Sequence, residues 1–286
     1  MWELFEKNAG YLGASDDFNG ASLVVMGVPM DFTVTLRPGT RLGPSCIRQA
    51  SQGLEEYSPY LDRDLRDYKF FDAGDLVLPP GNVQESVKRI AHAVGNLLGE
   101  GKFPLLLGGE HLLSLPVIEV AAHFYPELAV IHLDAHLDLR DEYNGQKLSH
   151  ATVMRRTAEI MGGLNIYQLG VRSGCREEFA YARAHTNLFF NEVLSPLQKV
   201  VRALENRPVY LTLDIDVLDP AYAPGTGTPE PGGCSPQEII QALHYLGHTR
   251  IVGLDLVEVS PLYDPSGHTA FLAAKLAREA ILCFSP

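Results

Sequence analysis

Short apolar runs alternate with longer, partly polar segments along the whole chain, and this alternation limits the possible folds more than any other feature. Eight runs, rich in β-branched or aromatic residues, have the length of strands. They are Ser22–Val28, Tyr68–Ala73, Phe103–Leu107, Leu128–Asp134, Asn165–Val171, Asn187–Phe190, Pro208–Asp216 and Ile251–Val259. Strands that alternate with helices form mostly parallel sheets with helices on both faces. An open three-layer sheet and a closed barrel both fit, and in both the active site lies at the carboxyl ends of the strands.

The segments between these runs have the apolar spacing that is typical of helices. The clearest are Val83–Leu98, Leu112–Phe124, Pro236–Leu246 and Thr269–Leu282. No long linker, repeat or low-complexity segment interrupts the 286 residues, of which 46% are hydrophobic. We therefore expect one α/β domain over residues 1–286.

Several features indicate a soluble cytoplasmic protein. No apolar run approaches the roughly 18 residues of a membrane span, and the start lacks the pattern of a secretory signal. The four cysteines lack Cys-x-x-Cys spacing, which fits reduced thiols. The formal net charge of −12 disfavours nucleic acid and anionic membranes as partners and favours cationic ligands.

A dense group of possible metal ligands follows the fourth predicted strand. The segment Ile131–Asp138 reads Ile-His-Leu-Asp-Ala-His-Leu-Asp. In an extended strand alternate residues point to the same side, so Asp134, His136 and Asp138 are predicted to converge. His132 has the same parity, and we interpret it as a core histidine or one that supports a ligand, not as a ligand itself.

Two other predicted strands end in residues of the same kind. Asp214 and Asp216 share one side at the end of the seventh strand, and His111 follows two glycines after the third. Each residue alone could be structural, since an aspartate at a strand end often caps the following helix. Four carboxylates together at the ends of apolar strands would repel one another and lose hydration. Two divalent cations would offset their charges.

The donor atoms also predict the metal. Two imidazoles and four carboxylates without a thiolate suit Mn²⁺, and less well Fe²⁺, Co²⁺ or Ni²⁺, rather than a structural zinc. A pair of such ions activates water as a nucleophile at neutral pH. The sequence therefore predicts a hydrolytic site with two Mn²⁺ ions per subunit.

Long motifs in the chain resemble those of the ureohydrolase family, which includes arginases and agmatinases. The motifs are Gly27–Asp31, Arg37–Pro44, Gly108–His111, Asp134–Leu139, Ser149–His150, Asp214–Pro220, Ala223–Gly233 and Asp255–Val259. The resemblance extends from about residue 22 to the end of the chain and is greatest to bacterial agmatinases. It implies an open, eight-stranded, mostly parallel sheet in a three-layer α/β/α sandwich, and a homo-oligomer that is a trimer or a hexamer.

The resemblance also implies two overlapping sets of metal ligands. One Mn²⁺ would be held by His111, Asp134, Asp138 and Asp214. The other would be held by Asp134, His136, Asp214 and Asp216, so that Asp134 and Asp214 bridge the two ions.

The chain departs from the family pattern at two positions near these ligands. Glu110 stands where many relatives have aspartate, and Leu137 stands where threonine is commoner. We expect neither to alter catalysis, because Glu110 is not itself a ligand and Leu137 should point away from the metals.

Two further residues acquire roles from the resemblance. Taken alone, His150 could be a capping or surface histidine, and Glu258 a buried ion-pair partner. The resemblance implies that His150 passes a proton near the leaving amine, together with Asp138, and that Glu258 binds the substrate's guanidinium. The loop Ala223–Gly233 is expected to form a wall of the site, and Arg37–Pro44 a turn that serves either the substrate or a subunit contact.

The resemblance favours agmatine over arginine as the substrate, with putrescine and urea as products. Arginases bind the α-carboxylate and α-amine through a Ser-Gly-Asn element, which the interval Leu139–Ser149 lacks. Arginine, guanidinobutyrate and aminopropyl-agmatine remain alternative substrates for the same metal site.

Two other functional classes share part of the pattern. Zinc deacetylases have a similar sheet, but they bind one zinc ion and lack the second set of aspartates and histidine. A metal-stabilised scaffold without activity is the other alternative, although every expected ligand is present here. We therefore expect an enzyme that acts on a small cationic guanidino compound.

Overall fold

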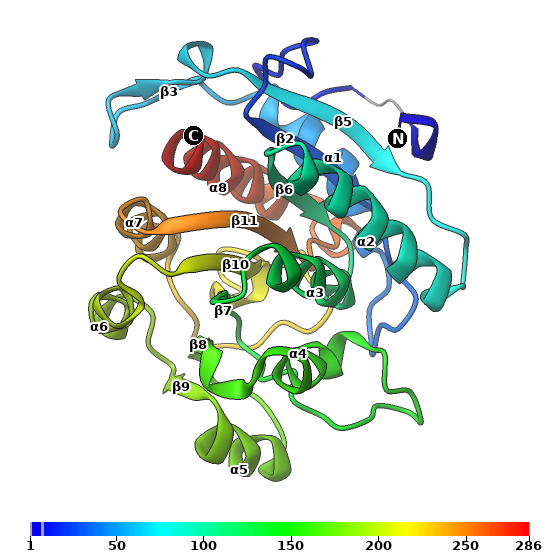
Figure 1. The fold of residues 1–286 in the computed structure, drawn as a ribbon, viewed down its shortest axis with the longest axis vertical. Coiled ribbons are helices and arrows are strands. Elements are labelled where there is room, and N and C mark those ends of the chain that lie inside the picture. The colour runs from blue at the N-terminus through cyan, green and yellow to red at the C-terminus, as the bar shows by residue number, and fades with distance from the viewer. Residues whose placement is uncertain (1, 7–8, 286) are drawn as a thin grey trace.

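A nine-stranded sheet forms the centre of the computed structural model, which describes residues 2–6 and 9–285. Its strand order is β1-β5-β2-β6-β11-β10-β7-β8-β9 (Figure 1). Eight of these strands pair in parallel, and they correspond to the eight predicted ones. They are β2 (Leu23–Val28), β5 (Phe70–Leu76), β6 (Phe103–Gly108), β7 (Ala129–Leu133), β8 (Ile166–Val171), β9 (Asn187–Phe190), β10 (Pro208–Asp214) and β11 (Arg250–Val257).

The predicted three-layer α/β/α sandwich is confirmed, but the predicted number of strands is wrong by one. The ninth strand, β1 (Phe5–Glu6), pairs antiparallel with β5 at the edge of the sheet. A strand of two residues is too short for an alternating pattern to reveal it. A separate hairpin of β3 (Tyr57–Ser58) and β4 (Arg63–Asp64) was not predicted either.

Helices cover both faces of the sheet (Figure 1). Four pack on one face, namely α1 (Gly43–Ser51), α6 (Leu194–Leu204), α7 (Pro236–Leu246) and α8 (His268–Phe284). The other face carries α2 (Val83–Gly99), α3 (Ser114–Phe124), α4 (Val153–Met161) and α5 (Arg176–His185). Short 3-10 turns span Trp2–Leu4, Thr40–Leu42, Leu65–Asp67, His111–Leu113, His150–Thr152, Gly163–Asn165, Ile215–Val217 and Pro261–Tyr263.

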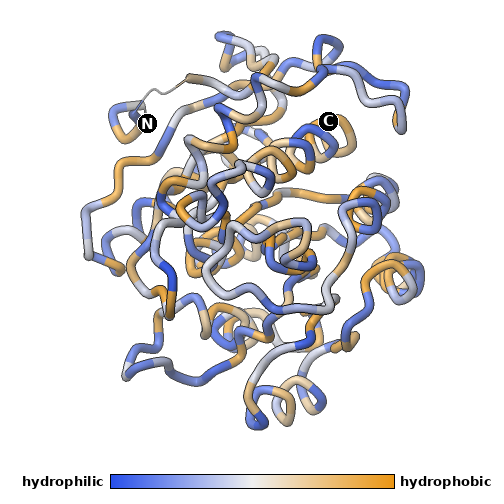
Figure 2. Tube along the Cα trace, turned by 180° about the vertical axis from the view of Figure 1, so that it is seen from behind, coloured by the Kyte–Doolittle hydropathy of each residue, from blue (hydrophilic) through white to orange (hydrophobic). Residues whose placement is uncertain are grey.

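Side chains of the central strands are buried on both faces, because each face meets helices. In β2, Leu23 and Val25 join the core beneath α1 and α8, whereas Val24 and Met26 join the core beneath α2 and α3. Apolar segments accordingly run through the middle of the molecule (Figure 2). Among the described residues, no helix is both long and apolar enough to span a membrane.

The topology brings four strand ends together that are far apart in the sequence. Strands β6, β11, β10 and β7 are neighbours in the middle of the sheet and run in the same direction. Their carboxyl ends therefore meet along one edge, where the predicted ligands lie.

A buried arginine, which the sequence analysis did not identify, ties α1 to the sheet. The guanidinium of Arg48 is only 1% exposed and donates to both carboxylate oxygens of Asp72, at 2.8 and 2.9 Å. It also pairs with Asp75 and donates to the carbonyl of Gly74. One buried cation thus compensates two carboxylates of β5.

We predict that Arg48→Met destabilises the fold by about 3–5 kcal/mol, because it removes the counter-charge of the buried Asp72 carboxylate. Urea unfolding at fixed protein concentration measures this change. The control is Arg89→Met on α2, whose partly exposed ion pair with Glu85 should change the unfolding free energy by no more than about 0.5 kcal/mol. An Arg48→Met protein as stable as the wild type would contradict the role of this ion pair.

Candidate metal centre and active site

The four central strands deliver one acidic or imidazole side chain each to the same edge of the sheet. Asp214 is the last residue of β10, while Asp134 and Glu258 directly follow β7 and β11. His111 begins the 3-10 turn that follows β6. All four side chains are buried.

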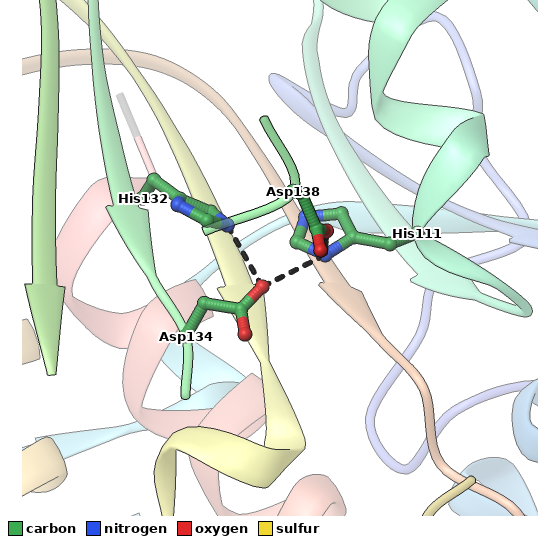
Figure 3. A group of neighbouring side chains, drawn as sticks. All are labelled: His111, His132, Asp134 and Asp138. Carbon is green, nitrogen blue, oxygen red and sulfur yellow. Dashed lines mark hydrogen bonds and ion pairs between the residues drawn. The ribbon is translucent and has the colours of Figure 1, made fainter. Parts of the chain in front are cut away.

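The first group of side chains surrounds the Nδ1 atom of His111. This nitrogen lies 3.1 Å from Oδ2 of Asp134 and 3.2 Å from the Oδ2 atoms of Asp138 and Asp214. Figure 3 shows the His111 ring directed at the carboxylate of Asp134. None of these contacts has hydrogen-bond geometry, so Nδ1 is buried without a hydrogen-bond partner.

A relay behind His111 determines which ring nitrogen faces the carboxylates. Tyr210 and Thr212 each donate a hydroxyl proton to the buried carboxylate of Asp255, at 2.6 Å. The Oγ1 atom of Thr212 lies 2.8 Å from Nε2 of His111 and, having given its own proton to Asp255, accepts the Nε2–H. The lone pair of Nδ1 therefore points at three carboxylate oxygens, an arrangement that needs a proton or a cation between them.

The second group of side chains surrounds His136. Its Nδ1 lies 2.9 Å from Oδ2 of Asp216 and 3.5 Å from Oδ1 of Asp134. The Oδ2 atom of Asp216 is also buried without a hydrogen-bond partner. Asp134 contacts the histidines of both groups. Of these two histidines, Asp214 contacts only His111, through Oδ2, and its other oxygen, Oδ1, accepts the N–H of Asp216 at 2.9 Å. The bridging role of Asp214 stays a prediction.

The cluster fits a pair of cations better than it fits hydrogen bonding alone. Burial, with the negative charges of Asp216 and Asp134, raises the pKa of Asp214 well above its usual range. Burial lowers the pKa of His111, but its carboxylate contacts outweigh burial and leave that pKa well above the ordinary value. Without cations the cluster must therefore hold protons, which bound metal ions would displace.

The predicted ligands converge, but the predicted reason is wrong for one segment. Strand β7 ends at Leu133, so Asp134, His136 and Asp138 lie on an irregular loop and not on an extended strand. Asp138 has a φ of 52°, and its carbonyl accepts the N–H groups of Met154 and Arg155 at the start of α4. These bonds hold the strained backbone that turns the Asp138 carboxylate toward His111.

The other strand-end prediction needs the same correction. Strand β10 ends at Asp214, and Asp216 lies in the 3-10 turn Ile215–Val217, where its backbone N–H donates to the Asp214 carboxylate. Leu137 is fully buried in the core on the face covered by α2, α3, α4 and α5, and it also lines the cavity described below.

His132 contacts a predicted ligand, Asp134, and its role as a supporting residue stays a prediction. Its Nε2 lies 2.8 Å from Oδ2 of Asp134 (Figure 3). Its Nδ1 lies 3.1 Å from Nε2 of Gln168, an amide that can only donate, so His132 carries its proton on Nε2 and donates to Asp134. The same amide donates to the carbonyl of Leu137, at 2.8 Å, and so ties the ligand loop to β8.

A cavity of about 350 Å³ opens onto this cluster. The predicted residues His150 and Glu258 line it, together with five of the six expected metal ligands. Thr228 contributes to its wall from the loop Ala223–Gly233, as predicted. Arg140, Tyr143 and Glu178 also line the cavity and were not singled out from the sequence.

Glu258 links the cavity to the metal centre. Its carboxylate accepts the backbone N–H of His111 at 2.8 Å, and its own N–H donates to the carbonyl of Gly109 at 2.9 Å. Its φ of 64° is unfavourable for a residue with a side chain, which is typical of functional sites. Burial raises the pKa of Glu258 to about 8.

His150 begins the 3-10 turn His150–Thr152, and Ser149, not His150, provides its cap. The segment Val34–Arg37 lines a smaller adjoining cavity with His150 and Glu258, so the predicted turn Arg37–Pro44 begins beside these two residues. Thr33 and Thr35 contact the His150 ring. Both lie between the sequence motifs Gly27–Asp31 and Arg37–Pro44, so only the structure reveals these contacts.

Residues 21–283 match the family model of the Arginase family. The chain belongs to the arginase family. An agmatinase from Bacillus anthracis is 50% identical over 275 residues, which is 95% of each chain. A crystal structure of a putative agmatinase from Clostridium difficile has a TM-score of 0.92 and 41% identity, and the match covers 94% of this chain and 99% of that one. A guanidinobutyrase from Pseudomonas aeruginosa is 36% identical over 273 residues, covering 91% of this chain and 85% of the relative.

These similarities confirm the predicted enzyme class. The chain is a ureohydrolase-type enzyme that acts on a guanidino C–N bond, not a zinc deacetylase or an inactive scaffold. Two groups of side chains could each hold a metal ion, namely His111, His132, Asp134 and Asp138, and Asp134, His136 and Asp216.

We predict that Asp214→Asn binds fewer divalent ions than the wild type, because it removes one negative charge from the contacts around His111. Metal analysis after dialysis against Mn²⁺ measures the number of ions per chain. Asp141→Asn is the control, since Asp141 is exposed and pairs with Arg156 outside the cavity. If Asp214→Asn retains the wild-type metal content, Asp214 is not a ligand.

Proposed function

We propose that this chain hydrolyses agmatine to putrescine and urea with two Mn²⁺ ions. The ions would be held by His111, Asp134, His136, Asp138, Asp214 and Asp216. The observation that carries the proposal is the Nδ1 lone pair of His111, buried and directed at three carboxylate oxygens. Nitrogen and oxygen donors without sulfur favour Mn²⁺ over a structural zinc.

When bound, the two cations would activate water for attack on the guanidinium carbon. The residues of the cavity then supply orientation. The buried carboxylate of Glu258 faces the cavity and offers a bidentate partner for the planar guanidinium. Its tie to the backbone of His111 fixes the guanidinium relative to the metal centre.

His150 and Asp138 both line the cavity, and we assign proton transfer to these two residues. The C–N bond to the butylamine breaks, and the departing nitrogen must gain a proton as urea forms. Burial lowers the pKa of His150, so its ring is neutral at neutral pH and can accept and pass on a proton.

Two observations support agmatine as the substrate. The agmatinase from Bacillus anthracis is more similar to this chain than the guanidinobutyrase is, at 50% against 36% identity. The interval Leu139–Ser149 also lacks the Ser-Gly-Asn element with which arginases bind an α-carboxylate. An unpaired, desolvated carboxylate on arginine would cost several kcal/mol.

One residue of the cavity favours a second candidate, guanidinobutyrate. Arg140 presents a cation that could pair with a carboxylate tail. However, its Nε lies 3.6 Å from a carboxylate oxygen of Glu178, and its guanidinium lies 5.4 Å from the ring centre of Tyr143. Because Glu178 already offsets this charge, agmatine stays the first candidate.

We predict that kcat/KM for agmatine exceeds that for arginine and for guanidinobutyrate by roughly a thousandfold. The measurement uses one Mn²⁺-loaded preparation and also includes aminopropyl-agmatine, which carries a longer amine tail. Arg140→Met serves as the matched variant and should not lower kcat/KM for agmatine. A wild type that prefers guanidinobutyrate, with the preference lost in Arg140→Met, would instead identify a guanidino-acid hydrolase.

We also predict that the affinity for agmatine rises with pH. With a pKa of about 8, Glu258 is mostly neutral below that pH, and only its anion pairs with guanidinium. Nearby cations favour the anion, so the rise should be complete by about pH 9. Measured KM values should fall over this interval in the wild type and in Glu258→Asp. Glu258→Gln should bind more weakly and without this pH dependence, and an equal pH dependence in that variant would assign the titration to another group.

A further inference from the structure

The loop between β2 and α1 places a threonine at each nitrogen of the His150 ring. Oγ1 of Thr33 lies 3.2 Å from Nδ1, and Oγ1 of Thr35 lies 2.8 Å from Nε2. The Thr33 hydroxyl also accepts the backbone N–H of His150, at 3.0 Å. Both threonines therefore hold the ring in place. Whether each hydroxyl donates or accepts determines whether the nitrogen that faces it is unprotonated or protonated.

Glu110 accepts the hydroxyl proton of Thr33. Its side chain is fully buried, and its Oε1 accepts the Thr33 hydroxyl at 2.9 Å. Its Oε2 accepts the N–H groups of Phe32 and Thr33, at 2.6 and 2.7 Å. Three donors point at two oxygens, so the carboxylate acts only as an acceptor. The single hydroxyl proton of Thr33 is thus used by Glu110.

The hydrogen bond from Thr33 to Glu110 determines the tautomer of His150. Since Thr33 cannot donate to the ring, it can only accept from Nδ1, and neutral His150 must carry its proton there. Nε2 is then unprotonated and accepts the hydroxyl proton of Thr35. Ser149 Oγ also lies 3.3 Å from Nδ1, but its hydroxyl can accept or donate and does not favour either tautomer.

We propose that Glu110 is a positioning residue that acts through Thr33 to fix the Nδ1–H tautomer of His150. The basic Nε2 is thereby directed to Thr35, which lines the cavity with His150. The inference rests on the proposed role of His150 in proton transfer. It also assigns a function to Glu110, the departure from the family pattern to which the sequence analysis gave none.

Glu110→Gln tests the proposal with a side chain of the same size. If the amide oxygen accepts the two backbone N–H groups, the amide NH₂ must donate to Thr33. The Thr33 hydroxyl then has to donate to Nδ1 of His150, and the ring proton moves to Nε2. The substitution should therefore reverse the tautomer of His150 without removing the ring.

The readout is ¹⁵N NMR of the metal-free, diamagnetic full chain, labelled on its histidine rings. Protonated and unprotonated ring nitrogens have well separated ¹⁵N shifts, and His150→Asn assigns the signals. We expect Nδ1–H in the wild type and Nε2–H in Glu110→Gln. A wild-type ring with the proton on Nε2, or a Glu110→Gln ring unchanged from the wild type, would overturn the proposal.

Thr33 provides a second pair of variants in case Glu110→Gln does not fold. Thr33→Val removes the acceptor and should leave a mixture of tautomers, whereas Thr33→Ser should restore Nδ1–H. With Mn²⁺ bound, Thr33→Val should lower kcat for agmatine about tenfold with little change in KM or metal content, and Thr33→Ser should recover most of the loss. Equal kcat values and tautomers in both variants would contradict the role of the hydroxyl.

The two proposals fail separately. If the wild type does not hydrolyse agmatine, the proposed function is wrong, but the NMR measurement still decides the tautomer. If agmatine is hydrolysed while the tautomer ignores Glu110 and Thr33, only the positioning role is wrong.

Discussion

Four carboxylates buried at one edge of an apolar sheet are the constraint on which the rest of this structure depends. Parallel pairing of β6, β11, β10 and β7 forces their carboxyl ends together, and each end delivers a charged or imidazole side chain. Buried like charges repel strongly, so the cluster must hold either protons or cations. Cations that replaced the protons would link this edge of the sheet to hydrolytic chemistry.

The residues behind the cluster determine how it can act. Asp255 through Thr212 directs the lone pair of His111 at the carboxylates, and Gln168 through His132 donates a proton to Asp134. Asp255 can only accept a hydrogen bond, and the amide nitrogen of Gln168 can only donate one. Each therefore determines where the neighbouring Thr212 or His132 carries its proton. The same logic relates Glu110 to His150, so proton positions around the site follow from the buried network.

The sequence predicted much of the fold and of the ligand set for physical reasons. Long apolar runs such as β10 and amphipathic helices such as α7 carry strong periodic signals, whereas β1 is too short to carry one. The motifs located the converging side chains, but the extended strand expected through Asp138 is a loop held by α4, which no local pattern reveals. Arg48 and Thr33 act through contacts distant in sequence, with Asp72 and Glu110, so their roles emerged only from the structure.

The central claim is that this buried cluster binds two Mn²⁺ ions. Anomalous diffraction at the manganese absorption edge, from crystals grown with Mn²⁺, tests it most directly. We expect two peaks per chain, one among His111, Asp134, Asp138 and Asp214 and the other among His136, Asp134, Asp214 and Asp216. A single peak, or a peak coordinated by His132 in place of these ligands, would contradict the account.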